Sequence, residues 1–391
     1  MVIFGVCYFF TTHLTFFDPI KRALNNLYIS DIYYQILMDS RQERGNDLIT
    51  IVDATQLYDR GRIGCMFEEI AECEPAVVGV DCIYQGFRGD TLGTNRLVEG
   101  AFSLDKPIFA VKLKEYDAEK EEYSKVVYSV MCVPGSKEYI LDGFTNVSYD
   151  NSRSTVRQFV TDMVVNNDTL HSLAYMVATA YSDDAKDLRS LKPQSINYSP
   201  TKFNVVPYDS IAEYKSLITD HIVIVGAMDD DADKHFTPYG LRPGTEIQAY
   251  MTQTILAHDA KKDVNFFVVL LVSAIIILLT DVMQTEIGEQ RKKCKNTVLK
   301  FLLETALFKN IINLIWIGIL VYINFILFVY LDLYFNPVIM LTCVALLVEA
   351  RLFYNSVSKA LSLYKEKRAS KNIGKESARN MESGLVTKHK N

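Results

Sequence analysis

Cysteine is scarce in this 391-residue chain: it holds seven, and no two of them form a CxxC pair. Structural zinc sites usually draw on such pairs, so a zinc-binding module is not expected. Cys65 and Cys73 lie eight residues apart on one predicted helix, about 12 Å at 1.5 Å per residue, which is too far for a disulfide. We expect free thiols at Cys65, Cys73, Cys82 and Cys132, with a disulfide to Cys82 or Cys132 as the less favoured alternative.

The chain also lacks the local signatures of common catalytic centres. It contains no nucleophile elbow, no Ser/His/Asp order and no phosphate-binding glycine loop. No sequence cue pairs Cys82 with a base, and His235 has no further His or Cys at metal-ligand spacing. The sequence therefore predicts a protein that is not an enzyme, without a known cofactor and without a nucleic-acid partner.

Long apolar runs are present, and they are concentrated in the last third of the chain. Three stretches of 17, 22 and 16 residues carry no charge, and they begin at Val264, Asn310 and Leu333. A helix needs roughly 20 apolar residues to cross a bilayer core, and about 17 suffice. We therefore predict three transmembrane helices, at about 264–282, 310–331 and 333–350, within a membrane region over 264–355.

The first 17 residues, MVIFGVCYFFTTHLTFF, carry no charge either. They lack the basic start and the small-residue cleavage motif of a cleaved signal peptide. We predict an uncleaved N-terminal transmembrane anchor over 1–17, and an amphipathic surface helix is the alternative.

The charge distribution orients these segments. Six Lys or Arg face three Glu between residues 284 and 309, and ten face three Glu after residue 349. Basic loops stay in the cytoplasm, so residues 19–263 are expected outside it and the tail 356–391 inside. The outer segment has 37 acidic and 25 basic residues, whereas residues 264–391 have 9 and 16.

The outer segment alternates short apolar runs with helical stripes. The runs LITIVD, AVVGVD and PIFAVKL are separated by amphipathic patterns over 60–74 and 92–103. Continuous apolar strands between such helices predict an α/β fold, a mostly parallel sheet sandwiched by helices. We further expect an antiparallel excursion within 139–164, a helix over 168–181, a strand over 221–226 and a last helix that begins at Pro243–Thr245.

Several acids follow these strands directly. Parallel sheets bind ligands beyond the carboxyl ends of their strands. The predicted ligand site is therefore Asp53, Asp81 and Asp233, with Glu246 from the start of the last helix, and a divalent cation is the candidate ion. The alternative is that these carboxylates accept hydrogen bonds from following helix amides. Asp229–Asp231 are expected to be solvated, and catalysis is the least favoured hypothesis.

The ordered segments IVDATQLYDRGRIGCMFEEIAECEPAVVGVDCIY, SINYS, HIVIVGAMDDDADKHFTPYG and RPGTEIQAYMTQTIL resemble the cyclase/histidine-kinase-associated sensory extracellular domain of the second type, along roughly residues 20–355. That family is bacterial and senses signals outside the cytoplasm to drive a cytosolic output enzyme. The resemblance therefore implies a multi-pass sensor of the bacterial inner membrane. It transfers no catalytic residues.

About 40 residues follow the last predicted span, which is too few for a kinase or a cyclase. We therefore expect an unknown ligand outside, anionic lipid near the basic tail, and a separate cytosolic signalling partner; a homodimer is left open. An extracytoplasmic metal-dependent hydrolase and a structural component of an envelope complex are the alternative functions.

Overall fold

The computed structural model describes residues 29–40, 43–87, 89–132, 136, 138–147, 155–260, 262–264, 306–331 and 333–334, with single positions between 267 and 289 and between 354 and 364. Contacts divide the chain into two compact units. One unit consists of residues 26–263 and 325–334, and it contains the whole α/β fold. The other comprises residues 1–25, 264–324 and 335–391.

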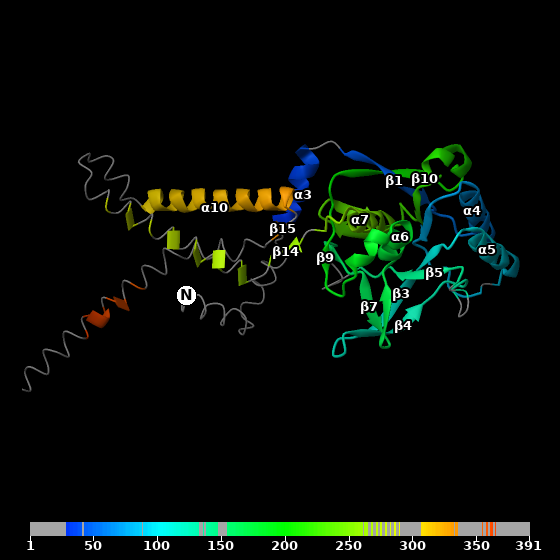
Figure 1. The fold of residues 1–391 in the computed structure, drawn as a ribbon, viewed down its shortest axis with the longest axis horizontal. Coiled ribbons are helices and arrows are strands. Elements are labelled where there is room, and N and C mark those ends of the chain that lie inside the picture. The colour runs from blue at the N-terminus through cyan, green and yellow to red at the C-terminus, as the bar shows by residue number, and fades with distance from the viewer. Residues whose placement is uncertain are drawn as a thin grey trace, which may run out of the picture. The chain divides into compact units, whose positions relative to one another are not determined.

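A nine-stranded mixed sheet forms the centre of the first unit (Figure 1). Six of its strands are parallel and lie in the order β10-β1-β11-β2-β3-β5. The second half of β3 continues into β4, β7 and β8, and the β3–β4 and β7–β8 pairs are antiparallel. The strands are β1 (Arg44–Asp53), β2 (Val77–Val80), β3 (Ile108–Asp117), β4 (Glu122–Val127), β5 (Leu141–Phe144), β7 (Asp162–Val165), β8 (Asp168–His171), β10 (Thr201–Pro207) and β11 (Ile222–Gly226).

Helices cover both faces of the parallel strands. Helices α4 (Arg60–Glu72) and α5 (Thr91–Ser103) pack on one face, where they share a core with Val52, Val80 and Val225. Helices α6 (Leu173–Tyr181) and α7 (Gly244–Ala257) pack on the other. The remaining elements are α3 (Ile29–Ser40), α10 (Ala306–Tyr330), η2 (Asp183–Leu188), η3 (Ile211–Leu217), η4 (Asp231–Asp233), β6 (Gln158–Phe159), β9 (Gln194–Ser195), β12 (Lys234–Thr237), β13 (Gly240–Pro243), β14 (Lys262–Asp263) and β15 (Leu333–Tyr334).

The central strands are buried on both faces because their side chains are apolar in both directions. All residues of β2 and β11 are buried, as are the last apolar residues of β1. Strands that are covered by helices on both faces are continuous runs of apolar residues. Each fully buried Ile or Val stabilises the fold by roughly 1.5–3 kcal/mol. The predicted α/β fold with a mostly parallel sheet between helices is confirmed.

Two local predictions are wrong in part. Residues 141–144 join β3 in parallel, although the rest of the predicted antiparallel excursion is borne out by β6 and β7, which pair antiparallel with β9 and β8. Residues 168–171 form strand β8, and the following helix begins only at Leu173, because Asn166 and Asn167 adopt positive φ angles (48° and 67°) and close a hairpin. The edge strand β10 was not predicted at all.

The predicted anchor over 1–17, most of the span over 333–350 and most of the tail over 356–391 lie outside the described residues. Helix α10 covers most of the span predicted over 310–331. In the part of the chain that the structure describes, no helix combines the length and the apolar character that a membrane crossing requires.

Candidate functional site

Three neighbouring strands bring their carboxyl ends to the same level. Asp53 of β1 pairs in register with Gly226 of β11, and Val225 pairs with Val80 of β2, so that Asp81 follows at the level of Gly226. Strands lie about 4.8 Å apart, which places the Cα atoms of Asp53 and Asp81 roughly 10 Å apart. Side chains at this level alternate with the valines that face α4 and α5, so they face α6 and α7.

Asp81 meets the start of helix α7. The Thr245 hydroxyl donates to Asp81 Oδ2 over 3.3 Å. Thr245 can approach because Gly226 has no side chain; a Cβ there would overlap the Thr245 hydroxyl. Burial raises the pKa of Asp81 well above its usual range, the charge of Asp233 raises it further, and Thr245 and Lys112 oppose the shift. Asp81 therefore favours its neutral form.

Asp233 is the second carboxyl group of this site. It lies against the first residue of α7, since a Cβ on Gly244 would be 2.5 Å from Asp233 Oδ2. Its side chain is 47% exposed, and His235 Nε2 lies 3.5 Å from Oδ1. Asp81 and Asp233 thus form a pair of one partly buried and one solvated carboxyl group beside a helix N-terminus, an arrangement in which a proton or a cation relieves the repulsion.

Asp53 has a different environment. Its Oδ1 accepts from the Thr55 amide (2.9 Å), the Thr55 hydroxyl (2.5 Å) and the Met228 amide (3.1 Å). These bonds tie the turn after β1 to the turn after β11. Asp53 thus matches the alternative in which the carboxylate satisfies backbone amides.

Glu246 also lies in separate surroundings. Its Oε1 is 3.3 Å from Arg242 Nη1, and burial raises its pKa, with Arg242 opposing and Glu43 adding to the shift. The ionised Glu246 in turn raises the pKa of Tyr250, after burial as the main cause. Of the four predicted site residues, Asp81 and Asp233 both lie at the start of α7, whereas Asp53 and Glu246 have their own partners.

The acidic loop before Asp233 is solvated, as expected. Lys234 Nζ bridges Asp229 (2.6 Å) and Asp231 (2.8 Å), whose side chains are 79% and 95% exposed. Among the described residues, no group of three or more His, Cys, Asp or Glu side chains is arranged to hold a metal ion. The four cysteines of the outer segment are free, and burial raises the pKa of the Cys82 thiol to about 12, which disfavours a nucleophilic role.

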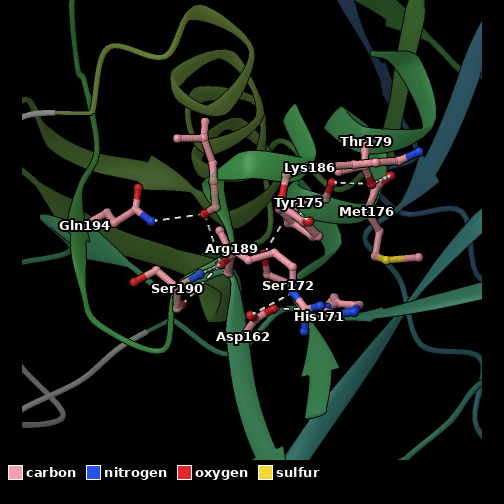
Figure 2. A network of polar contacts seen from close by, with 12 residues as sticks. Asp162, His171, Ser172, Tyr175, Met176, Thr179, Lys186, Arg189, Ser190 and Gln194 are labelled. Carbon is pink, nitrogen blue, oxygen red and sulfur yellow. Dashed lines mark hydrogen bonds and ion pairs between the residues drawn. The ribbon is translucent and has the colours of Figure 1, made fainter. Parts of the chain in front are cut away.

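Sequence reasoning identified Thr245 as a helix start but missed its contact with Asp81. It also missed a second polar cluster around Asp162 and His171 at the β7–β8 hairpin, which Figure 2 shows. A hairpin-forming Asn166–Asn167 pair would have indicated that these two residues lie opposite each other.

The comparisons with known proteins give one match. The CHASE2 domain model matches residues 6–281, which is more than half of the chain. No curated protein matches the chain, and no solved structure does. The chain belongs to the CHASE2 domain family, a family of sensory extracellular domains.

Proposed function

We propose that this protein is a membrane-bound sensor whose α/β unit binds a small ligand or a partner outside the cytoplasm and passes the signal to a separate cytosolic protein. Family membership supports the sensory role. The proposed ligand position is the pair Asp81 and Asp233 at the start of α7, with a divalent cation as one candidate.

The observation that carries the proposal is the course of helix α7. Its first turn contacts Asp81 and Asp233, and its 14 residues span about 21 Å at 1.5 Å per residue. It ends at His258 in the left-handed conformation (φ 52°), and four residues later the chain forms β14. Because most of α7 is buried, a displacement at its start is carried along the helix rather than absorbed by it.

Strand β14 is paired with a second strand at the point where the chain leaves the unit. It pairs in parallel with β15, with Lys262 opposite Leu333 and Asp263 opposite Tyr334. The two exits of the chain towards residues 264 and 335 are therefore held together. A movement of α7 acts on both exits.

A column of aromatic rings gives α7 a second connection. Tyr250 of α7 contacts Tyr198 (5.1 Å between ring centroids), Tyr198 contacts Tyr34 of α3 (5.9 Å), and Tyr34 contacts Phe328 in the last turns of α10 (5.0 Å). Tyr34 also donates to the carbonyl of Ile196 (2.9 Å). Helix α7 is thus connected to α3 and to the end of α10 through packed rings in one unit.

The membrane part of the proposal is supported by sequence alone. The uncharged runs over 1–17, 264–282, 310–331 and 333–350 would be the spans, and the basic segments 284–309 and 356–391 would lie in the cytoplasm of a bacterium. These basic segments would contact anionic lipid and the cytosolic partner. A ligand shifts such an assembly only through its differential affinity for two positions of α7, commonly 1–3 kcal/mol.

The experiment tests whether a displacement of the start of α7 is transmitted beyond the end of the helix. Gly226→Ala places a methyl group where the Thr245 side chain lies and pushes the start of α7 away from β11. In the full chain in lipid nanodiscs, we expect this variant to raise hydrogen exchange at 262–264 and to change exchange over 284–309. Thr245→Val is the milder displacement, because it keeps the size of the side chain and removes the hydroxyl contacts with Asp81 and the Ala227 carbonyl.

Four Gly/Ser residues inserted after Lys261 separate α7 from β14 and should abolish both effects. The matched control carries the same insertion after Lys120, in the exposed turn between β3 and β4, and should preserve both effects. An undiminished change over 284–309 in the Lys261 insertion would show that the signal does not travel through α7 and β14.

A further inference from the structure

A second titratable cluster lies at the β7–β8 hairpin, apart from Asp81 and Asp233 (Figure 2). Asp162 of β7 is only 6% exposed. His171 Nδ1 donates to its Oδ1 over 2.6 Å, and Arg189 Nε donates to its Oδ2 over 3.2 Å. A nearly buried carboxylate therefore lies between a permanent cation and an imidazole, the side chain whose charge changes between about pH 5 and 8.

His171 is also the residue immediately before helix α6. It ends β8, and Ser172 is the N-cap of α6, where its hydroxyl accepts from the Tyr175 amide. The imidazole lies 5.3 Å from the Tyr175 ring, and the side chain is 29% exposed, so that water reaches it while Asp162 stays enclosed.

The frame around the cluster is held by bonds that do not titrate. The Ser190 amide donates to the Thr161 hydroxyl (2.6 Å), and the Ser172 amide donates to the Thr161 carbonyl (2.8 Å). The Tyr175 hydroxyl donates to the Lys186 carbonyl (3.2 Å), and burial raises the pKa of Tyr175, which keeps it neutral. Within this frame, His171 is the residue that contacts the Asp162 carboxylate and directly precedes the N-cap of α6.

The other charged groups around the cluster leave this conclusion intact. The segment from η2 to Arg189 contributes Lys186 and Asp187, opposite charges that act on Tyr175. Strand β5 contributes Asp142, which acts on Tyr128 and Cys132 instead. The positive end of the α6 dipole opposes a protonated His171, but it amounts to roughly half a unit charge. The full charge of Asp162 is in direct hydrogen-bond contact.

We propose that Asp162, His171 and Arg189 form a proton-sensitive clamp that fixes the start of α6 to the β7–β8 hairpin, and so make external acidity a second input to the sensor. Protonation of His171 converts its bond to Asp162 into a charge-assisted one, which is the stronger kind. Helix α6 packs against α7, and its Val177 lies on Gly79 of β2. The clamp thus acts on the helix that neighbours the proposed transmission path.

The test measures protection factors of the amides over 161–176 by hydrogen exchange, in the full chain in nanodiscs at pH 5.5 and pH 7.5. We expect protection to rise about fivefold at the lower pH in the wild type, the low end of typical coupling. His171→Gln, which retains an amide donor but does not titrate, should remove the rise. The matched control is His221→Gln, since the His221 ring contacts the Thr219 carbonyl before β11 and lies outside the β7–β8 hairpin. It should retain the rise.

A wild type without the rise, or an equal rise in His171→Gln, would overturn the clamp. A titration of the His171 ring protons by NMR gives a second measurement that does not depend on the variant. Asp162→Asn should shift that titration to lower pH, and an unshifted titration would contradict the ion pair. Because both readouts are local to the hairpin, a negative result would leave the proposed ligand site at Asp81 and Asp233 untouched.

Discussion

The carboxyl group of Asp81 and the hydroxyl group of Thr245 lie 3.3 Å apart, so the end of strand β2 and the start of helix α7 meet at one polar contact. The two residues are 164 positions apart in sequence. Asp81 therefore contacts the first turn of the helix that continues to β14, and a change in its charge acts on that helix.

Asp81→Asn should stabilise the protein increasingly as pH rises. Burial and Asp233 raise the pKa of Asp81 in the folded state, so between its unfolded and folded pKa values only the folded state holds the proton. The wild type therefore loses stability as pH increases from about 4 to the folded pKa, at about 1.4 kcal/mol per pH unit. Asn does not titrate and should lack this slope.

The measurement is the difference in the free energy of unfolding between wild type and Asp81→Asn at several pH values. Repeating it with added Mg²⁺ or Ca²⁺ tests the cation hypothesis, since an ion bound by Asp81 and Asp233 would stabilise the wild type above the variant. A pH-independent difference would mean that Asp81 is ionised throughout. An unchanged difference with the ions would remove the cation.

Variants of Asp53 test whether its acceptor oxygen or its charge is needed for stability. Asp53→Ala removes the acceptor of the Thr55 amide and one of the two acceptors of the Met228 amide, which also donates to the Thr55 hydroxyl, and should cost about 1–3 kcal/mol of stability. Asp53→Asn keeps an acceptor oxygen at Oδ1 and should cost less than half as much. Chemical denaturation of both variants measures this contrast. Equal losses would show that the charge of Asp53, and not its acceptor oxygen alone, stabilises the fold.

Membrane orientation has its own test. In a chain without native cysteines, Asp230→Cys and Ser383→Cys are exposed separately to a membrane-impermeant thiol reagent in intact cells with a permeable outer membrane. The distribution of Lys and Arg places residue 230 outside and residue 383 in the cytoplasm, so only the first should react. Labelling of both sites, or of residue 383 alone, would contradict the proposed topology.

Local sequence was sufficient for the centre of the fold. Strands that end in IVD and VVGVD, and the helix after RPGTEI, are marked by apolar runs and start signals within a few residues. Their acids were correctly placed at strand ends because parallel strands share their carboxyl edge.

The details that the sequence did not predict depend on distant partners. The role of Asp53 is decided by the Met228 amide, 175 positions away, and no local pattern marks that contact. Strand β10 lies at the sheet edge, and its alternation of exposed and buried residues was too short to identify without β1 beside it. Strand β8 was mistaken for the start of α6, because it has only four residues and directly precedes the helix.

The aromatic column predicts how firmly α3 and α10 are joined to the unit. Tyr34→Phe keeps the ring contacts with Tyr198 and Phe328 and loses the bond to the Ile196 carbonyl, at about 1 kcal/mol. Tyr34→Ala removes a 4% exposed ring and should cost about 3–5 kcal/mol. Ile32→Ala, on the 48% exposed side of the same helix, is the control and should stay within about 0.5 kcal/mol.

Hydrogen exchange at β14–β15 in the same variants tests whether the rings connect α7 to these two strands. If the rings connect α7 to both exits of the chain, Tyr34→Ala should accelerate exchange at 262–264 and 333–334, and Tyr34→Phe should leave it near the wild-type rate. Uniform exchange rates across the three variants would show that β14 and β15 are held by α7 alone. In that case α3 and the end of α10 would be passive supports, and transmission would depend on the single connection from His258 to Asp263.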